Sequence, residues 1–314
     1  MIDAKMIEAL VDAVVSELES LAEKPKPAAT KPQEQPQIKP PPQPQRKPQA
    51  QPEDGLEAAS LMQTTPLPGI KNPVDPEGLL ALKQTTTARI CAGHAGPRLR
   101  TEDLLAFQAD LAITKDALEK QVNPSLLEEF GLFTVGTKIT GGKEEYLLRP
   151  DLGRQLSDEA KKIIAERCTK KPDVQICVGD GLSARAIEAN LAKIFPVLKA
   201  GCETAGLSMG TPFFIERCRV GVMNDIGDLL EPQVVILLIG ERPGLGRADS
   251  MSAYMGYKPH EGLTDADRDV ICNIFDGGGV NPLEAGAYAI RLAERMIKKG
   301  ASGIQLKLLE GEET

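Results

Sequence analysis

The sequence contains no tryptophan, few aromatic residues (4%) and only two histidines, His94 and His260. With little aromatic surface to stack bases and a net charge of −8, it lacks the features of a nucleic-acid-binding protein. Its longest apolar run, Val234–Gly240, is too short to cross a bilayer, and residues 1–20 lack the continuous apolar core of a signal peptide. These absences argue against nucleic acid and membranes as partners and predict a cytoplasmic protein.

The cysteines include no C-x-x-C pair. Zinc sites need thiolates and imidazoles clustered at tetrahedral ligand spacing, and the sequence offers no such cluster, so it predicts no metal site. Most of the six cysteines are therefore expected to be small buried hydrophobic groups: Cys91, Cys168, Cys177, Cys202, Cys218 and Cys272.

Residues 1–21 have the periodicity of an amphipathic helix, with apolar residues recurring every fourth position from Ile2 to Leu18. Residues 22–72 follow as a predicted disordered linker, because 25–52 contains ten prolines and seven glutamines and cannot bury enough apolar surface to order itself. A short apolar helix on a long tether indicates a docking peptide. The alternative is a helix that folds back onto its own globular domain.

Residues 73–171 are predicted to form a mostly helical lead-in domain. Helical spacing covers 75–84, 101–118 and 157–169, while 130–146 resembles short β structure with a turn at its glycine pair.

Residues 172–314 alternate between short apolar runs, glycine-bearing loops and helices. The apolar runs at 174–178, 234–239 and 270–275, with a further strand expected within 210–222, are typical of the strands of a mainly parallel sheet. The sequence therefore predicts an α/β fold with a Rossmann-like doubly wound sheet.

Three glycine-bearing loops follow predicted strands, namely GDGLS (179–183), GERPGLG (240–246) and DGGG (276–279). In a parallel sheet all three would emerge at the carboxyl ends of the strands, where such sheets bind ligands. The alternative is that each glycine serves only a tight turn. The Gly-Lys-Ser/Thr of a P-loop is absent, and GDGLSA lacks the third glycine of a dinucleotide fingerprint.

Several longer motifs together resemble the small (light) subunit of ethanolamine ammonia-lyase, over about residues 73–305. They are TTARICAGHAGPR (86–98), LRPDLGR (148–154), VGDGLS (178–183), GTPFF (210–214), LIGERPGLG (238–246) and ASGI (301–304). The resemblance implies an adenosylcobalamin-dependent enzyme that converts ethanolamine to acetaldehyde and ammonia. It also implies a partner, a TIM-barrel large subunit that holds the substrate, while the small subunit encloses and orients cobalamin at the subunit interface and is inactive alone.

The resemblance also implies which residues contact cobalamin. Family contacts carry over to Val220 in RCRVGVM, to Glu241 in GERPG, and to a cysteine near the Asp267-Arg268 pair. At the last position Val270 takes the aligned place and Cys272 stands two residues on, so either fills the third contact.

Two further expectations follow from the same resemblance. Neither histidine stands in the Asp-x-His-x-x-Gly context that ligates cobalt, so the cofactor is expected to keep its own base as lower ligand. The N-terminal helix is expected to dock on a bacterial microcompartment shell or another assembly partner. The competing interpretations are a stand-alone Rossmann-type nucleotide-binding protein and a non-catalytic assembly adaptor.

Overall fold

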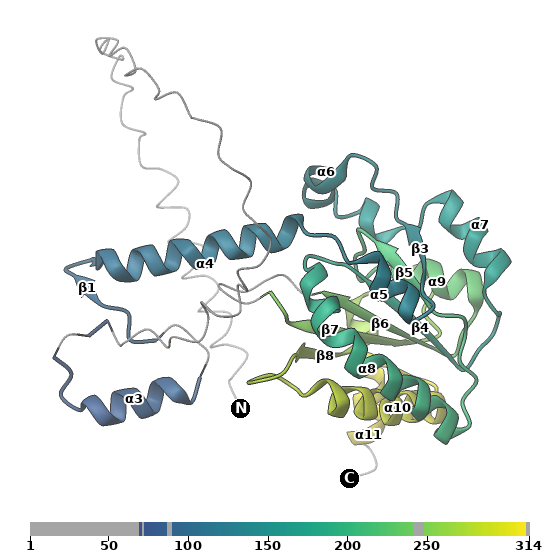
Figure 1. The fold of residues 1–314 in the computed structure, drawn as a ribbon. Coiled ribbons are helices and arrows are strands. Elements are labelled where there is room, and N and C mark those ends of the chain that lie inside the picture. The colour runs from purple at the N-terminus through teal and green to yellow at the C-terminus, as the bar shows by residue number, and fades with distance from the viewer. Residues whose placement is uncertain (1–68, 71, 87–89, 241–247, 312–314) are drawn as a thin grey trace, which may run out of the picture. The chain divides into compact units, whose positions relative to one another are not determined.

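The computed structural model describes residues 69–70, 72–86, 90–240 and 248–311 (Figure 1). The chain divides into two units, Met1–Leu56 and Glu57–Thr314, and every described residue belongs to the second. The predicted helix over 1–21, nearly all of the predicted linker and Glu241 lie outside the described residues.

The secondary structure alternates along most of the second unit. The helices are α3 (Pro76–Gln84), α4 (Thr101–Glu119), α5 (Pro124–Glu129), α6 (Gly142–Leu148), η1 (Leu152–Arg154), α7 (Asp158–Arg167), α8 (Ala184–Ala205), α9 (Val222–Leu230), η2 (Asp265–Asp267), α10 (Pro282–Lys299) and α11 (Gly303–Gly311). The strands are β1 (His94–Ala95), β2 (Arg98–Leu99), β3 (Phe133–Gly136), β4 (Val174–Gly179), β5 (Phe213–Glu216), β6 (Val234–Gly240), β7 (Met251–Tyr257) and β8 (Arg268–Ile274).

The main sheet has six strands in the order β3-β5-β4-β6-β7-β8. The first four are parallel, whereas β7 is antiparallel to both β6 and β8. The expected α/β class is confirmed, and the sheet is mixed and mostly parallel, with β7 as its antiparallel strand. Because β8 reverses twice relative to β6, it runs in the same direction as β6 and ends at the same edge of the sheet.

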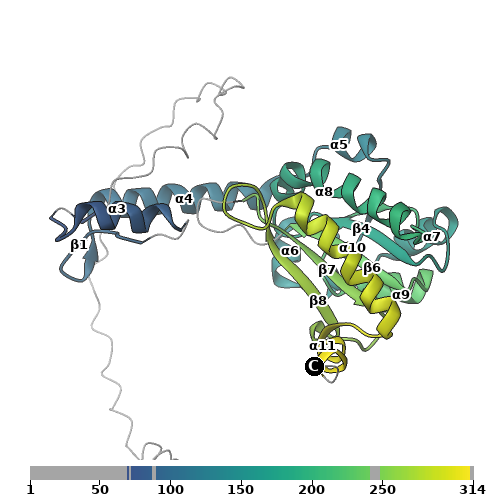
Figure 2. The same cartoon turned by 90° about the horizontal axis from the view of Figure 1, so that it is seen from below.

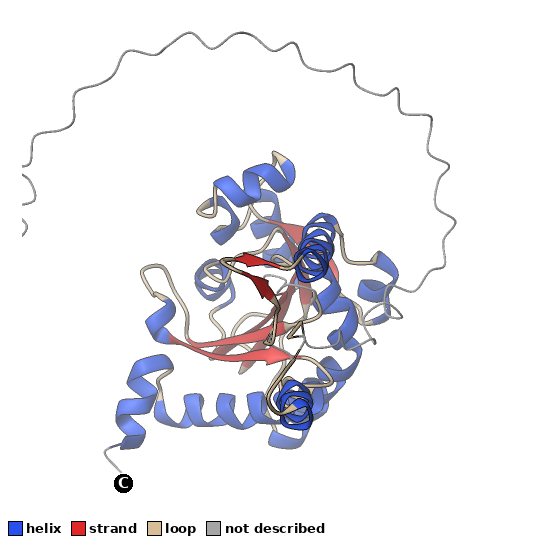
Figure 3. Ribbon diagram, turned by 90° about the vertical axis from the view of Figure 1, so that its left-hand side faces the viewer, coloured by secondary structure: helices blue, strands red, loops and turns tan. Residues whose placement is uncertain are grey.

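The two central strands β4 and β6 are buried along their whole length, as the continuous apolar runs in the sequence predicted. Helices α8 and α10 cover one face of the sheet and lie side by side in Figure 2. Helices α7 and α9 cover the other face, so the strands lie between two helical layers (Figure 3). Each face therefore has its own apolar core.

The two long covering helices begin and end where the sequence supplies caps. Ser183 accepts a hydrogen bond from the Ala186 N–H at the start of α8, and Asn281 caps α10, whose first residue is Pro282. Each helix ends at a glycine in the left-handed region, where a side chain would be strained.

Two predicted elements were wrong in detail, and one strand was not predicted. Strand β7 was missed, because MSAYMGY carries little of the β-branched signal that identifies strands. The strand expected within 210–222 is confined to β5, and α9 begins at Val222. The segment 130–146 holds one strand, β3, whereas its glycine pair begins helix α6 rather than a β-turn. Through β3, the main sheet also includes a segment that precedes residue 172.

The cysteine prediction is confirmed for four of the six thiols, since Cys168, Cys177, Cys202 and Cys218 are buried. No helix in the described ranges is long and apolar enough to cross a membrane. Within those same ranges, no three metal-ligating side chains lie close enough together to hold a metal ion.

Candidate cofactor-binding site

Val220 lies in a short segment, Arg217–Gly221, that joins β5 to α9. Its first residue, Arg217, has a φ of 54°, in the left-handed region that side chains rarely adopt. The Thr137 hydroxyl donates to the Arg217 carbonyl at 3.1 Å, and the Arg217 guanidinium donates to the Ile139 carbonyl at 3.1 Å. These contacts from the loop after β3 hold an unfavourable backbone conformation in place.

The rest of this segment is held by Tyr146 of α6. The buried tyrosine hydroxyl donates to the Cys218 carbonyl at 2.8 Å, and burial raises the pKa of Tyr146, which keeps the hydroxyl protonated as a donor. The Arg219 guanidinium lies 4.2 Å from the centre of the Tyr146 ring and donates to its carbonyl at 3.1 Å. The segment is therefore fixed from Arg217 to Arg219, directly before Val220, which makes it a preorganised part of the fold.

Asp180, in the GDGLS loop after β4, connects this segment to the centre of the sheet. Its two carboxylate oxygens accept hydrogen bonds from the backbone N–H groups of Arg217, at 2.9 Å, and Cys218, at 3.0 Å. Burial raises the pKa of this carboxyl group. Open α/β sheets bind ligands in the crevice where neighbouring strands connect to opposite faces, and β4 and β5 form such a pair here. The Asp180 carboxylate bridges this crevice.

The glycines of GDGLS serve close packing rather than a bound phosphate. A Cβ at Gly181 would approach the Gly240 carbonyl oxygen to 2.2 Å, and one at Gly179 would approach the Cys218 side chain to 2.7 Å. The Leu182 N–H donates to the Gly240 carbonyl at 3.1 Å, while buried Ser183 caps α8. Ser183 thus occupies one N–H group at the start of α8, which is the phosphate site of a dinucleotide fold.

The DGGG loop is also a turn. Gly277 and Gly278 have φ values of 77° and 128°, and the Phe275 N–H donates to the Val280 carbonyl at 3.1 Å. It does lie at the same edge of the sheet as GDGLS.

Val270 and Cys272 lie on the edge strand β8 and are both exposed, Val270 by 48%. Val270 pairs directly with Tyr254 of β7, and Tyr254 packs against the core under α7 and α9. Val220 packs against that same core, whereas Ile271 belongs to the core of the opposite face. Since side chains alternate along a strand, Val270 and Cys272 lie on the same face of the sheet as Val220.

A β-bulge shapes β8 at Cys272. The register between β7 and β8 shifts between Met251 and Ala253, and Asn273 has a φ of 57°. Bulges bend a strand locally and re-aim its side chains, and they are common beside functional sites. The bulge therefore adjoins Cys272, whose neighbour Asn273 carries the left-handed backbone conformation.

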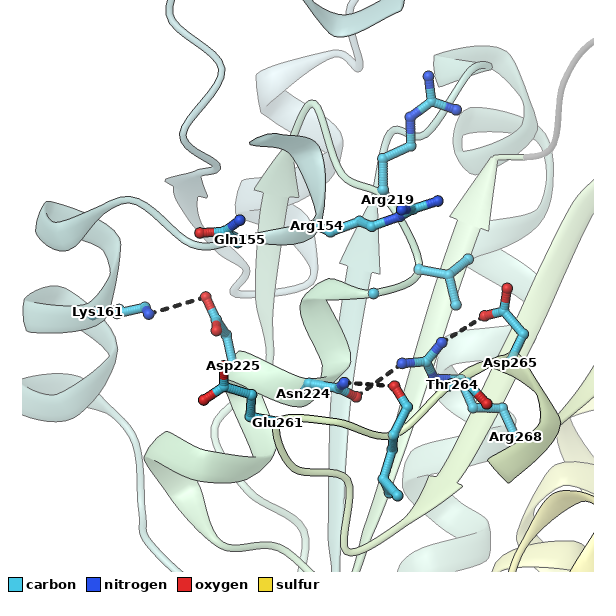
Figure 4. A pocket seen from close by; sticks show the side chains of 13 residues that line it. Arg154, Gln155, Lys161, Arg219, Asn224, Asp225, Glu261, Thr264, Asp265 and Arg268 are labelled. Atoms are coloured by element: carbon cyan, nitrogen blue, oxygen red, sulfur yellow. Dashed lines mark hydrogen bonds and ion pairs between the residues drawn. The ribbon is translucent and has the colours of Figure 1, made fainter. Parts of the chain in front are cut away.

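A pocket of about 760 Å³ adjoins Val220 on the α9 side of the sheet (Figure 4). Its lining is strongly charged and consists of Arg154, Gln155, Lys161, Arg219, Val220, Gly221, Asn224, Asp225, Glu261, Leu263, Thr264, Asp265 and Arg268. Arg268 crosses its floor, with one guanidinium nitrogen donating to Asn224 at 2.8 Å and another paired with Asp265 at 2.5 Å. The lining is thus more charged than that of most small-molecule pockets, which are predominantly apolar.

The structure thus places three of the four predicted contact residues, Val220, Val270 and Cys272, on one face of the sheet. Glu241 follows Gly240, the last residue of β6, and lies outside the described residues. The assignment of all four to cobalamin stays a prediction.

Sequence reasoning missed three other residues of this region. Tyr254 was hidden in the unrecognised strand β7. Arg154 and Arg219 stand inside motifs quoted above, LRPDLGR and RCRVGVM, and their basic charge was a usable signal.

Together the fold and the pocket define an α/β protein with a charged surface pocket beside Val220. A scan of protein families matches residues 76–307 to the ethanolamine ammonia-lyase light chain. Two relatives are the ethanolamine ammonia-lyase small subunits of Listeria monocytogenes serovar 1/2a and Listeria innocua serovar 6a. Each is 46% identical over 238 residues, which cover 76% of this chain and 80% of the relative. The chain therefore belongs to the ethanolamine ammonia-lyase light chain family, as a small subunit of that enzyme. This confirms the resemblance carried by the sequence motifs.

Proposed function

We propose that this chain acts with a TIM-barrel large subunit to convert ethanolamine to acetaldehyde and ammonia, with adenosylcobalamin as cofactor. The observation that carries the proposal is the 46% identity, over 238 residues, to proteins named ethanolamine ammonia-lyase small subunits. A small subunit implies a large one, and the exposed position of Val270 and Cys272 supports a site completed by a partner.

Within this proposal Val220, Glu241 and either Val270 or Cys272 cover one side of cobalamin. The residues present fit such a group. Apolar Val220 and Val270 suit a flat macrocycle, and the Arg219 Nε atom is buried beside Val220 with no hydrogen-bond acceptor among the described residues. When bound, adenosylcobalamin supplies the radical chemistry through cleavage of its cobalt–carbon bond. The side chains of this subunit orient the cofactor and exclude water.

The histidines support a cofactor that keeps its own base as the lower ligand of cobalt. His94 lies in the short strand β1 and His260 in the loop after β7, and both are exposed. The His260 Nδ1 atom lies 3.1 Å from the Lys258 carbonyl oxygen, a contact within its own loop.

The competing nucleotide-binding interpretation has little physical support. Ser183 already accepts a hydrogen bond from one N–H group at the start of α8, and Asp180 would place a carboxylate beside an incoming phosphate. We propose further that residues 22–72 are a linker and that residues 1–21 direct the enzyme to a bacterial microcompartment in the cytoplasm.

Reconstitution tests the main proposal. The chain alone, the large subunit alone and the complex are each titrated with adenosylcobalamin, and bound cofactor is followed by its visible spectrum. We expect tight binding and formation of acetaldehyde from ethanolamine only in the complex. Tight cofactor binding by this chain alone, or acetaldehyde formation without it, would contradict the proposal.

A further inference from the structure

The charges lining the pocket beside Val220 do not all cancel. Two cations of the pocket have carboxylate partners, in the ion pairs Lys161–Asp225 at 3.1 Å and Arg268–Asp265 at 2.5 Å. Arg154 and Arg219 have no carboxylate partner among the described residues. Two guanidinium groups without an anion remain at one end of the pocket.

Both groups keep donors available. The Arg154 guanidinium makes no hydrogen bond to any described residue, although its backbone N–H donates to the Asp151 carbonyl. Arg219 uses one terminal nitrogen for the Tyr146 carbonyl, and its Nε atom is buried without an acceptor in the described part of the chain. A buried donor without a partner is costly, so an acceptor in this position would be favourable.

The backbone is shaped to hold the two arginines beside each other. The Arg219 N–H donates to the Gly153 carbonyl at 2.8 Å, which joins the two segments. A Cβ at Gly153 would come within 2.8 Å of the Arg219 Cγ, and a Cβ at Gly221 within 2.9 Å of the Arg154 Cγ. Each glycine thus makes room for the stem of the arginine from the opposite segment.

The one carboxylate of the pocket without an ion-pair partner in the described ranges, Glu261, lies elsewhere. In Figure 4 it stands next to Asp225, at the opposite end of the pocket from Arg154 and Arg219. The arginine pair is therefore adjacent to Val220 and separated from the acidic end.

We propose that Arg154 and Arg219 bind the phosphodiester group of the nucleotide tail of cobalamin. The inference rests on the proposed function and deepens it. Arginine forks match phosphate oxygens in geometry and charge, and Val220 next to them is a predicted contact of the same cofactor. A cofactor that keeps its own base carries this tail folded beneath the ring, which brings the phosphodiester close to the residues that cover that side.

The test compares adenosylcobalamin with adenosylcobinamide, which lacks the nucleotide tail and its phosphodiester. Binding to the two-subunit complex is measured by equilibrium dialysis and absorbance. Arg154→Met is expected to weaken adenosylcobalamin binding about tenfold, the scale of a lost hydrogen bond to a charged group, and to leave adenosylcobinamide binding unchanged. Arg219→Lys keeps a cation over Tyr146 but loses Nε. It should likewise weaken adenosylcobalamin binding relative to adenosylcobinamide binding.

Arg149→Met is the matched control. Arg149 lies five residues before Arg154, is 56% exposed and is paired with Asp151, so its loss removes one positive charge without touching the pocket. It should leave the affinity ratio of the two cofactors unchanged.

Other outcomes would overturn the proposal. If the variants lost affinity equally for both cofactors, or for neither, the two arginines would not bind the phosphodiester. The proposed function would be unaffected by that result. Inorganic phosphate is another source of the same chemistry, so its binding to the cofactor-free complex is measured in parallel. If Arg154→Met lost phosphate binding but kept the ratio of the affinities for the two cofactors, the two arginines would bind free phosphate instead. A wild-type complex that binds neither cofactor would refute the proposed function as well.

Discussion

Cys272 differs chemically from the other thiols of the chain. Burial raises the pKa values of Cys168 and Cys202 to about 11 and holds those of Cys177 and Cys218 well above their usual range, so little reactive thiolate forms at these positions. Of the two remaining thiols, Cys91 is half-buried and Cys272 is exposed, at the bulge of the edge strand. Thiol reactivity therefore reports on one candidate contact residue.

We expect a disulfide reagent to modify Cys272 first in the two-subunit complex, and adenosylcobalamin to slow that reaction at least tenfold. The reason is that a contact with the cofactor removes the thiol from solvent. Mass spectrometry of the complex with and without cofactor measures the rate, and Cys272→Ser, which lacks the fast reaction, is the control. An unchanged rate would exclude Cys272 and leave Val270 as the third contact.

Glu241 follows the last residue of the fully buried strand β6, at the edge where open α/β sheets bind ligands. A carboxylate there can accept hydrogen bonds from the amide groups around a corrin ring. We therefore expect Glu241→Ala to weaken adenosylcobalamin binding about ten- to a hundredfold, as for a lost hydrogen bond to a charged group. Spectroscopic titration of the complex measures it, and an unchanged affinity would remove Glu241 from the site.

Among the elements, the loops after β4 and β5 depend on each other through Asp180. Asp180→Ala leaves the N–H groups of Arg217 and Cys218 without acceptors, which should reduce the free energy of unfolding by about 2–4 kcal/mol. The loss should also release the segment that carries Val220 and weaken cofactor binding. Urea unfolding and spectroscopic titration measure the two effects.

The opposite end of β4 offers a matched control. Asp173 precedes the strand and accepts hydrogen bonds from the Ser208 N–H at 2.9 Å and from Gln233. The Ser208 hydroxyl also donates to Asp173, at 2.6 Å, and this bond, together with the two others, lowers the pKa of Asp173. Asp173→Ala should destabilise the fold without changing cofactor affinity in the folded complex. If both variants lost affinity equally, the effect of Asp180 would be one of stability alone.

The elements also show what the sequence could predict. Continuous apolar runs identified β4 and β6, because burial on both faces of a strand leaves a local signal. Strand β7 left no such signal. Its residues, such as Tyr254 and Gly256, form a strand because they pair with β6 and β8 rather than because of their local propensity. The mixed sheet and the face shared by Val220 and Val270 therefore emerged only from the structure.

The candidate site follows the same rule. The resemblance to the family predicted the contact residues from local motifs, but Arg154 and Arg219 come from separate segments that meet only in the fold, through the Gly153 carbonyl. Likewise, the sequence left open whether GDGLS binds a ligand or forms a turn. The close approach of Gly181 to the Gly240 carbonyl shows that packing requires a glycine at this position of the loop.

At the scale of the whole molecule, the sequence joins two kinds of segment. Residues 76–307 match the enzyme family, whereas the apolar periodicity of residues 1–21 and the proline and glutamine content of 25–52 serve no predicted role in the chemistry. A linker of that composition, extended at about 3.1 Å per residue, would separate the first helix from the enzyme by several tens of ångströms. Docking and catalysis should therefore be separable by mutation.

Leu10→Glu with Val14→Glu tests this separation, because both changes place charges on the apolar face that would bind a partner helix or groove. We expect the variant enzyme to leave the microcompartment fraction of cell lysates for the soluble fraction, while its activity in solution remains that of the wild type. Glu8→Gln with Glu17→Gln, on the polar side of the same helix, is the control and should stay with the compartments. Continued co-sedimentation of the first variant would contradict docking through this face. A loss of activity in solution would show instead that the helix folds back onto the enzyme, since only a contact with the catalytic unit would couple the two.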